Sequence, residues 1–454
     1  MFSRVLVANR GEIAVRVIRA LHELGVEAVA VFSTADRDEL HVALADHAVC
    51  IGPPAAAESY LRISNVVAAA ETTACEAVHP GYGFLAENAK FVRACEASDL
   101  AFIGPPADVV EQLGDKVRAK KAMRAAGLPL VPGSDGAADL GDLRRAALEV
   151  GFPVLLKASA GGGGKGMRLV GSEDELEAAH ASASAESDAA FGDGSIYVEK
   201  AISPARHVEI QVLCDGDGNV LTLGERECSI QRRHQKLIEE SPSSALDPKT
   251  RETMESAVER ACLAIGYRNA GTFEFLVGAD SSFYFIEVNC RLQVEHPVTE
   301  LVTGIDIVRE QVRIAAGEKL ELTGRAPRRG HAIEIRINAE DPARGFLPAP
   351  GIVSTFVPPL GAGVRVDTAI REGGEIPPFY DSMIAKVAVW DETRPLAIAR
   401  AIRASMACPR LGARPVSVRA SPAAIRTCSR TMSIPVTSSV TGCSTWRRQF
   451  TSMK

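Results

Sequence analysis

The stretch GTFEFLVGADSSFYFIEVNCRLQVEHP, residues 271–297, has two strand-like segments on either side of a turn-forming one. Residues 271–275 and 285–289 are rich in aromatic and β-branched side chains, whereas glycine, aspartate and serine lie between them. The pattern predicts a β-hairpin with Asp280 and Ser281 as its central turn residues. Part of the fold is therefore expected to be an antiparallel sheet.

This hairpin brings acidic side chains face to face. Glu274 is expected directly opposite Glu287, and Asn289 on the same side, because side chains alternate along a strand. Facing carboxylates repel each other unless a cation lies between them, and carboxylate and amide oxygens are the ligands that Mg²⁺ prefers. The sequence therefore predicts a magnesium site. A solvated strand face that carries two acids by chance is the alternative.

The residues after the hairpin add charge to this candidate site. Arg291, Gln293 and Glu295 continue the alternation, so an extended chain would bring a cation and another carboxylate to the same face. Such a concentration of polar groups favours a functional site over a solvated face.

Three units are predicted in chain order, giving a mixed α/β and α+β fold. Residues 1–112 alternate apolar strands with helical patterns, which predicts a parallel α/β domain. Residues 113–202 predict a linker and a small lid. Residues 203–404 predict an antiparallel-sheet domain with most of the chemistry. The first strand is followed by Asn9 to Glu12, without the G-x-G-x-x-G fingerprint of dinucleotide-binding proteins.

A glycine run, GGGGKG at residues 161–166, lies between two strands expected in the lid. Glycines let backbone N–H groups approach phosphate oxygens, and Lys165 adds positive charge. The run differs from a Walker P-loop because Gly166 follows the lysine. A flexible hairpin or linker is the alternative, but the flanking strands favour a phosphate-binding lid.

Composition argues against several classes of protein. The net charge is −6, which gives no general reason to expect a nucleic-acid partner, and no apolar run is long enough to span a membrane. The ten cysteines form no C-x-x-C pair, so neither a zinc site nor a disulfide framework is predicted. Met1 to Ala8 lead directly into a strand pattern instead of a secretion signal, so we expect a cytoplasmic protein.

Four motifs together carry a family resemblance: residues 161–167, QRRHQK at 231–236, 271–275 and NCRLQVEHP at 289–297. They closely resemble the biotin carboxylase component of biotin-dependent acyl-CoA carboxylases, from residue 1 to about residue 404. The resemblance implies an ATP-grasp fold. It also implies ATP-dependent carboxylation of biotin by bicarbonate, through carboxyphosphate, as the first half-reaction of an acyl-CoA carboxylase.

The resemblance also implies cofactors, partners and residue roles. The implied cofactors are ATP and Mg²⁺ or Mn²⁺, and the implied substrate is biotin held by a biotin carboxyl carrier protein; a carboxyltransferase and a homodimer are implied as well. The implied ATP-binding residues are Lys116, Lys157, Gly163, Gly164, Glu199, Lys200, Ile202, His207, Gln231 and His234. The implied metal ligands are Glu274, Glu287 and Asn289. The residues implied to bind bicarbonate are Lys236, Arg291, Gln293 and Val294, with Glu295 as the base and Arg336 stabilising the biotin enolate.

Two rival functions remain at this stage. Another ATP-grasp ligase, joining a carboxylate to an amine, would share the lid and metal pair but has no evident use for Arg291, Glu295 and Arg336. A non-catalytic nucleotide-binding or scaffold protein is the second rival. Arg336 taken alone could also be a surface ion pair, although its polar strand face fits a site.

The end of the chain has a different composition. The 62 residues from Thr393 to Lys454 contain no Asp or Glu, although 57 acidic residues occur among the 454 of the chain. The helical pattern also ends near Ala404, and residues 405–454 are rich in Arg, Ser, Thr and Pro. These features predict an atypical tail, produced by a reading-frame shift near Ser405. A functional basic tail is the alternative.

Overall fold

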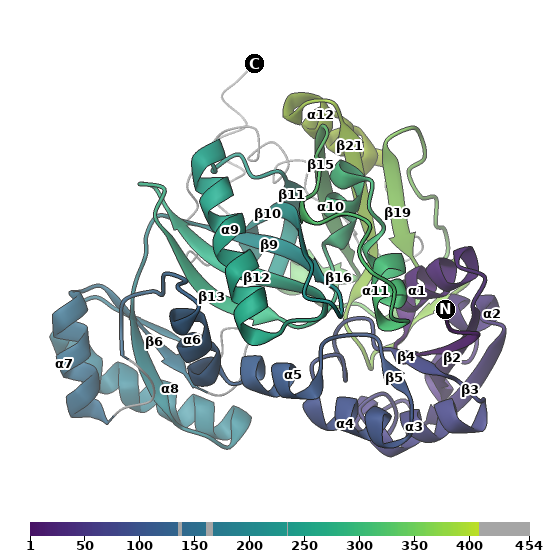
Figure 1. Ribbon diagram of the computed structural model, residues 1–454, viewed down its shortest axis with the longest axis horizontal. Helices are drawn as coiled ribbons and strands as arrows, with labels where there is room; N and C mark the ends of the chain where they lie inside the picture. Colours follow the sequence, from purple (N-terminus) through teal and green to yellow (C-terminus); the bar gives the residue numbers. More distant parts are fainter. Residues whose placement is uncertain (135–138, 160–166, 234, 408–454) are drawn as a thin grey trace.

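A computed structural model describes residues 1–134, 139–159, 167–233 and 235–407. Of the predicted site residues, Gly163, Gly164 and His234 lie outside the described residues, as does the predicted tail from residue 408 onward. In Figure 1 the parallel N-terminal domain lies at one end of the molecule, the lid at the other, and a large sheet between them.

The N-terminal domain is a five-stranded parallel sheet in the order β3-β2-β1-β4-β5. Its elements are β1 (Arg4–Val7), α1 (Gly11–Glu23), β2 (Glu27–Ser33), α2 (Leu40–Leu44), β3 (His47–Gly52), α3 (Ile63–Thr72), β4 (Ala77–His79), α4 (Ala89–Ala97) and β5 (Ala101–Phe102). The parallel α/β prediction is confirmed. Strand β3 was not predicted; it lies at the edge of the sheet, and three of its six residues are exposed.

Two short helices and the lid follow. The helices are α5 (Ala107–Gly114) and α6 (Lys116–Ala125). The lid pairs three antiparallel strands in the order β7-β6-β8 and adds two helices. Its elements are α7 (Leu140–Val150), β6 (Val154–Ala158), β7 (Arg168–Val170), α8 (Leu176–Phe191) and β8 (Ile196–Lys200). The glycine run would join β6 to β7, which are neighbours in this sheet.

The central sheet has nine strands, with the main order β13-β12-β9-β10-β11-β15-β21-β19 and β14 paired to β10. Its strands are β9 (Ala205–Cys214), β10 (Val220–Arg232), β11 (Gln235–Ser241), β12 (Asn269–Gly278), β13 (Phe283–Asn289), β14 (Gly324–Arg325), β15 (His331–Asn338), β19 (Val364–Thr368) and β21 (Met383–Asp391). The helices of this region are α9 (Pro248–Ile265), α10 (His296–Thr303), α11 (Ile307–Ala315) and α12 (Arg394–Ala407). The pairing along the main order is antiparallel, as the sequence predicted.

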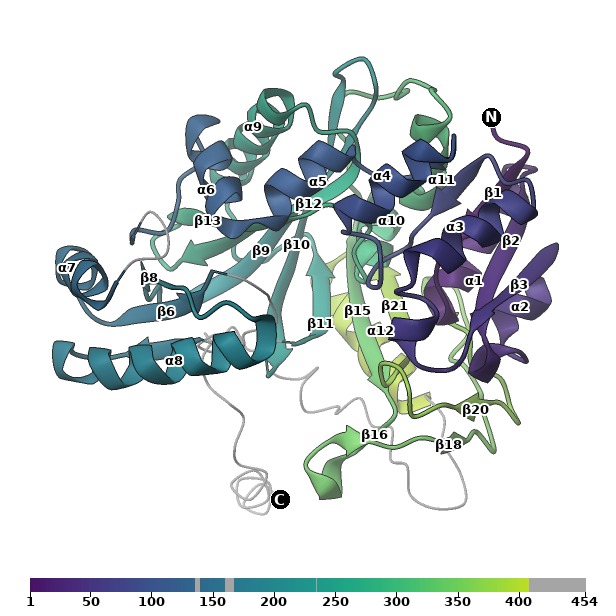
Figure 2. The same ribbon diagram turned by 90° about the horizontal axis from the view of Figure 1, so that it is seen from below.

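A shared hydrophobic core fixes the N-terminal domain against this sheet. Val17 and Leu21 of α1 belong to the same buried cluster as Val308 and Val312 of α11 and Leu223 of β10. Figure 2 shows the strands of the central sheet running between the lid and the N-terminal domain. Polar residues from α1 and from the sheet can therefore meet across the boundary between these units.

Candidate active site

The predicted hairpin is formed by β12 and β13, and Glu274 pairs with Glu287 as predicted. The turn itself was predicted wrongly. The N–H of Gly278 donates to the carbonyl of Ser282 at 2.8 Å, which leaves residues 279–281 as a three-residue loop. A register shift next to Glu274 offsets the additional loop residue, so the two carboxylates still face each other.

Glu274 is surrounded by hydrogen-bond donors. Its carboxylate accepts from His207 Nε2 at 2.6 Å, Asn289 Nδ2 at 2.8 Å, Lys236 Nζ at 2.9 Å and Gln293 Nε2 at 3.0 Å. Burial alone would raise the pKa of Glu274, but the Lys236 charge and the His207 contact outweigh it, so the pKa falls below its usual range. Glu274 is therefore ionised.

Glu287 differs from the facing Glu274 in its hydrogen bonding and in its pKa. Within the described part of the chain, we find no hydrogen bond to its carboxylate. Burial raises the pKa of Glu287, the facing charge of Glu274 raises it further, and Lys116 only partly opposes the effect. A cation between Glu274 and Glu287 would relieve this repulsion. Two carboxylates and an amide oxygen are a donor set that fits Mg²⁺. Asn289 presents Nδ2 to Glu274 in this structure while its Oδ1 accepts from Arg291, so its amide must turn over to offer oxygen to the metal.

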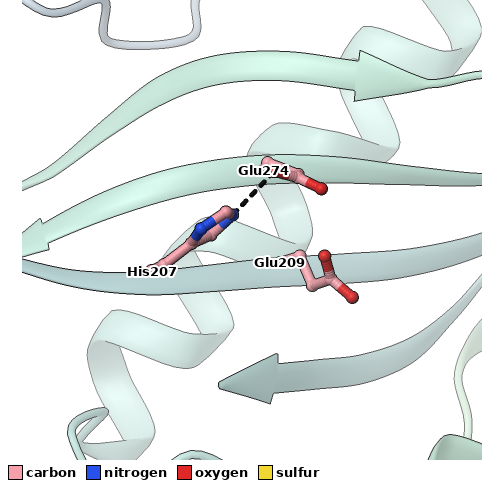
Figure 3. A group of neighbouring side chains, drawn as sticks. All are labelled: His207, Glu209 and Glu274. Carbon is pink, nitrogen blue, oxygen red and sulfur yellow. Dashed lines mark hydrogen bonds and ion pairs between the residues drawn. The ribbon is translucent and has the colours of Figure 1, made fainter. Parts of the chain in front are cut away.

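A second group could also hold a metal ion, with ligand atoms of His207, Glu209 and Glu274 within 4.8 Å of one another. Figure 3 shows the His207 ring directed at Glu274, with Glu209 beside them. Lys236 already contacts both carboxylates, and Arg226 Nε contacts Glu209 at 2.5 Å. Because protein cations compensate this group, the Glu287 side is the better place for a metal.

Lys236 joins three carboxylates at the centre of the site. Its Nζ lies 2.7 Å from Glu209, 2.9 Å from Glu274 and 2.7 Å from Glu295. Arg336 approaches the other oxygen of Glu295 through Nη2 at 2.8 Å. Burial alone would raise the pKa of Glu295, but Lys236 and Arg336 hold the pKa well below its usual range. A fully buried carboxylate is thus kept ionised between two cations.

The loop before Glu295 does not continue the strand, so the extended chain on which the predicted alternation depended is not present. Strand β13 ends at Asn289, and Glu295 lies at the N-terminal end of α10. The side chains still reach the same site. Arg291 Nη1 donates to Gln293 Oε1 at 2.9 Å, and its Nη2 donates to Asn289 Oδ1 at 3.1 Å.

A cleft of about 770 Å³ brings most of the predicted residues together. The predicted residues among its lining are His207, Gln231, Lys236, Glu274, Glu287, Asn289, Arg291, Gln293, Val294, Glu295 and Arg336. The opposite wall comes from the N-terminal domain, including Glu12 and Tyr82, and from the segment before β21, including Tyr380. The cleft therefore lies where the N-terminal domain meets the central sheet.

The remaining described residues of the predicted site lie in α6, the lid and the segment after it. Lys157 lies 2.5 Å from Glu199, which Lys120 also contacts. Lys116 is close enough to Glu287 for their charges to interact. Lys200, by contrast, donates to the carbonyl of Gly151 at 2.8 Å. Ile202 is half-buried.

Family models match nearly all of the described chain. Models for "Biotin carboxylase, N-terminal domain", "Carbamoyl-phosphate synthase L chain, ATP binding domain" and "Biotin carboxylase C-terminal domain" match residues 1–110, 115–323 and 334–408. A biotin carboxylase from Nostoc sp. is 53% identical over 409 residues, covering 90% of this chain and 92% of its own. Biotin carboxylase 1 of Bacillus subtilis is 52% identical, covering 89% of this chain and 90% of its own.

The chain belongs to the biotin carboxylase family. Among solved structures, a biotin carboxylase complex from Campylobacter jejuni superposes with a TM-score of 0.88 at 48% identity, covering 90% of this chain and 92% of that chain. The biotin carboxylase domain of 2-oxoglutarate carboxylase from Hydrogenobacter thermophilus gives a TM-score of 0.86 at 49% identity, covering 90% of each chain. The fold is therefore ATP-grasp, and the protein is an ATP-dependent ligase.

Sequence reasoning missed several groups at this biotin carboxylase site. Glu209 and Glu239 are fully buried acids that contact Lys236 and Arg336, and Arg226 compensates Glu209. Glu87 reaches across from the N-terminal domain to Arg291 Nε at 3.0 Å. The alternation of His207 and Glu209 on one strand was a signal for Glu209. No sequence spacing indicates Glu87, since 204 residues separate it from Arg291.

Proposed function

We propose that this protein carboxylates biotin with bicarbonate and MgATP, and that the cleft supplies the reacting groups. The observation that carries the assignment is the Glu295 carboxylate held between Lys236 and Arg336. We call Lys236, Arg291, Glu295 and Arg336 the bicarbonate end, and Lys116, Lys157, Glu199 and Glu287 the nucleotide end. A ligase that joins a carboxylate to an amine has no evident use for the bicarbonate end.

Bicarbonate activation needs an anion site and a base. Arg291, Lys236, Gln293 and the chain at Val294 would hold bicarbonate, and Glu295 would remove its proton as an oxygen attacks the γ-phosphoryl group. Glu295 is a weak base while Lys236 and Arg336 stabilise its charge. An incoming anion draws Lys236 and Arg291 toward itself, which weakens that stabilisation and raises the basicity of Glu295.

Phosphoryl transfer requires compensation of the negative charge that develops on the transferring group. Glu274, Glu287 and Asn289 would hold Mg²⁺, which supplies positive charge there when bound. Lys116 and Lys157 would contact the phosphates, and Glu199, Lys200, Ile202, His207 and Gln231 would hold the rest of the nucleotide. The same proposal includes Gly163, Gly164 and His234, which lie outside the described residues.

Arg336 would act in the second step. Carboxylation of biotin needs loss of the ureido N–H proton, which leaves an enolate-like oxyanion. Glu239 and Glu295 hold the guanidinium group at 2.7 and 2.8 Å, so it enters the cleft with its orientation fixed. A fixed cation stabilises the developing oxyanion without having to reorganise.

Membership of this family implies a biotin carrier protein as partner. We extend the proposal to a carboxyltransferase partner and a homodimer; the Hydrogenobacter thermophilus domain is described as a dimer. Among the described helices, none has the length and apolar character needed to cross a bilayer. The domain boundaries at residues 112, 202 and 404, the lack of nucleic-acid partners and the cytoplasmic location stay predictions.

The reading-frame proposal for the tail has independent support. The C-terminal family model ends at residue 408, close to the predicted change near Ser405. Resequencing the gene tests it, and an intact frame in a fully active protein would refute the shift.

The function is tested by ATP cleavage measured with and without bicarbonate, and with and without biotin. We expect bicarbonate to stimulate ADP formation strongly, and biotin to appear as carboxybiotin only when ATP, Mg²⁺ and bicarbonate are all present. ATP cleavage that responds to an amine instead would assign the protein to another class of ATP-grasp ligase.

A further inference from the structure

One buried cation beside the cleft has no role in the proposed chemistry. Lys386 lies on β21, where it pairs in register with Arg336 on one side and Asp367 on the other. Its side chain is fully buried. Burying an ammonium group away from water costs several kcal/mol unless nearby charges and hydrogen bonds offset the lost hydration. The contacts of Lys386 therefore show which groups stabilise its buried charge.

The contacts of Lys386 connect two walls of the cleft. Its Nζ donates to the carbonyl of Val294 at 2.9 Å, the peptide immediately before Glu295. The same Nζ lies 3.1 Å from Glu12 Oε1 on α1, and Glu12 accepts a hydrogen bond from the hydroxyl of Tyr82. One ammonium group therefore ties the loop that carries Glu295 to the N-terminal domain.

The nearby carboxyl groups do not compete strongly for Lys386. Asp367 lies 3.9 Å from Nζ and is already paired with Arg365 through both oxygens. Glu334 is fully buried, and neither of its oxygens has a hydrogen-bond partner in the structure. Burial raises its pKa well above the usual range, which favours the neutral acid. Among the described residues, the closest polar contacts of Lys386 Nζ are thus the Val294 carbonyl and Glu12, although burial raises the pKa of Glu12 as well.

We propose that Lys386 is a positioning residue for bicarbonate activation, which fixes the Val294 peptide and thereby orients Glu295 and Gln293. This inference rests on the proposed function. Without the ammonium group, the loop keeps the Arg291 to Glu87 contact at its start but loses its anchor at Val294. Small displacements of a base relative to its substrate lower the rate strongly, whereas the distant nucleotide contacts should remain intact.

The test compares Lys386→Met with wild type in steady-state ATP cleavage. We expect the KM for bicarbonate to rise about tenfold and kcat to fall, while the KM for ATP stays within about twofold. Any ATP cleavage that occurs without bicarbonate should not change. Lys386→Arg, which keeps a charged donor, should recover part of the loss.

Arg251→Met is the matched control for general destabilisation. Arg251 pairs with the buried Glu225 at 2.8 Å from helix α9 and does not line the cleft. It should lower thermal stability with no change in either KM. If Lys386→Met does not fold, Glu12→Gln weakens the same anchor and should raise the bicarbonate KM about threefold.

Two outcomes separate this inference from the function on which it rests. A folded Lys386→Met variant with an unchanged bicarbonate KM, or with equal rises in both KM values, would overturn the positioning role. Wild-type ATP cleavage that ignores bicarbonate would instead overturn the proposed function.

Discussion

At the bicarbonate end each charged side chain lies against partners of opposite charge. At the nucleotide end Glu199 is paired with Lys157, whereas the charges of Lys116 and Glu287 are poorly compensated by the protein. Lys236 contacts three carboxylates, and Glu295 contacts two cations. At the nucleotide end, burial lowers the pKa of Lys116 and raises the pKa of Glu287. The difference indicates that the first end is formed before substrate binds, while MgATP completes the second.

Glu295→Gln should have the largest effect, because it removes the proposed base. We expect bicarbonate-dependent ATP cleavage to fall by about 10³-fold, within the range for general bases, with nearly unchanged affinity for MgATP. Steady-state kinetics and nucleotide titration measure the two quantities. A variant that keeps a tenth of wild-type turnover would show that Glu295 is not the base.

Glu287→Gln should act through the metal instead. Turnover at fixed Mg²⁺ should fall by about 10²-fold, and added Mg²⁺ should restore part of it because one ligand has lost its charge. The measurement is a Mg²⁺ titration of ATP cleavage, with Glu295→Gln as the control whose Mg²⁺ response stays normal. Identical titrations for Glu287→Gln and wild type would remove Glu287 from the metal site.

The same two variants should differ in stability at neutral pH. Glu295 has a lowered pKa, so its charge stabilises the fold above the unfolded pKa of about 4.3, and this contribution is lost as the pH falls through the folded value. Glu287 has a raised pKa, so its contribution is present at low pH and is lost as the pH rises through that value.

Thermal unfolding without nucleotide at pH 7 should therefore show Glu295→Gln several degrees below wild type, because it leaves buried cations without a partner. Glu287→Gln should unfold at or slightly above the wild-type temperature. The difference in unfolding temperature between the two variants should become smaller at the lowest pH at which the protein stays folded. A loss of stability in Glu287→Gln as large as that in Glu295→Gln would contradict the charge comparison.

Glu87→Gln should have the smallest effect. Its carboxylate accepts from the Cys290 N–H at 2.9 Å and from Arg291, but it is partly exposed, so water can replace part of the lost contact. We expect a rise of about threefold in the KM for bicarbonate, with kcat little changed. A tenfold fall in kcat would mean that Glu87 does more than orient Arg291.

The sequence predicted the parallel domain, the antiparallel sheet and the pairing of Glu274 with Glu287, because alternation and turn composition are local signals. It did not predict the three-residue loop or the register shift beside Glu274. Each displaces the pairing by one residue, and because the two displacements cancel, Glu274 still pairs with Glu287. Glu87 and Lys386 reach the site only through tertiary packing. The distance from Lys386 to Val294 is 92 residues along the chain but 2.9 Å in space, and no periodicity encodes such a contact.

The most direct test of the account follows both products in one reaction: phosphate released from ATP and labelled carboxybiotin formed from bicarbonate. Wild type should form both, Glu295→Gln should form neither, and Arg336→Ala should keep much of the bicarbonate-dependent phosphate release while losing nearly all carboxybiotin. Equal loss of both products in a folded Arg336→Ala variant would contradict the division of the cleft between bicarbonate activation by Glu295 and biotin deprotonation at Arg336.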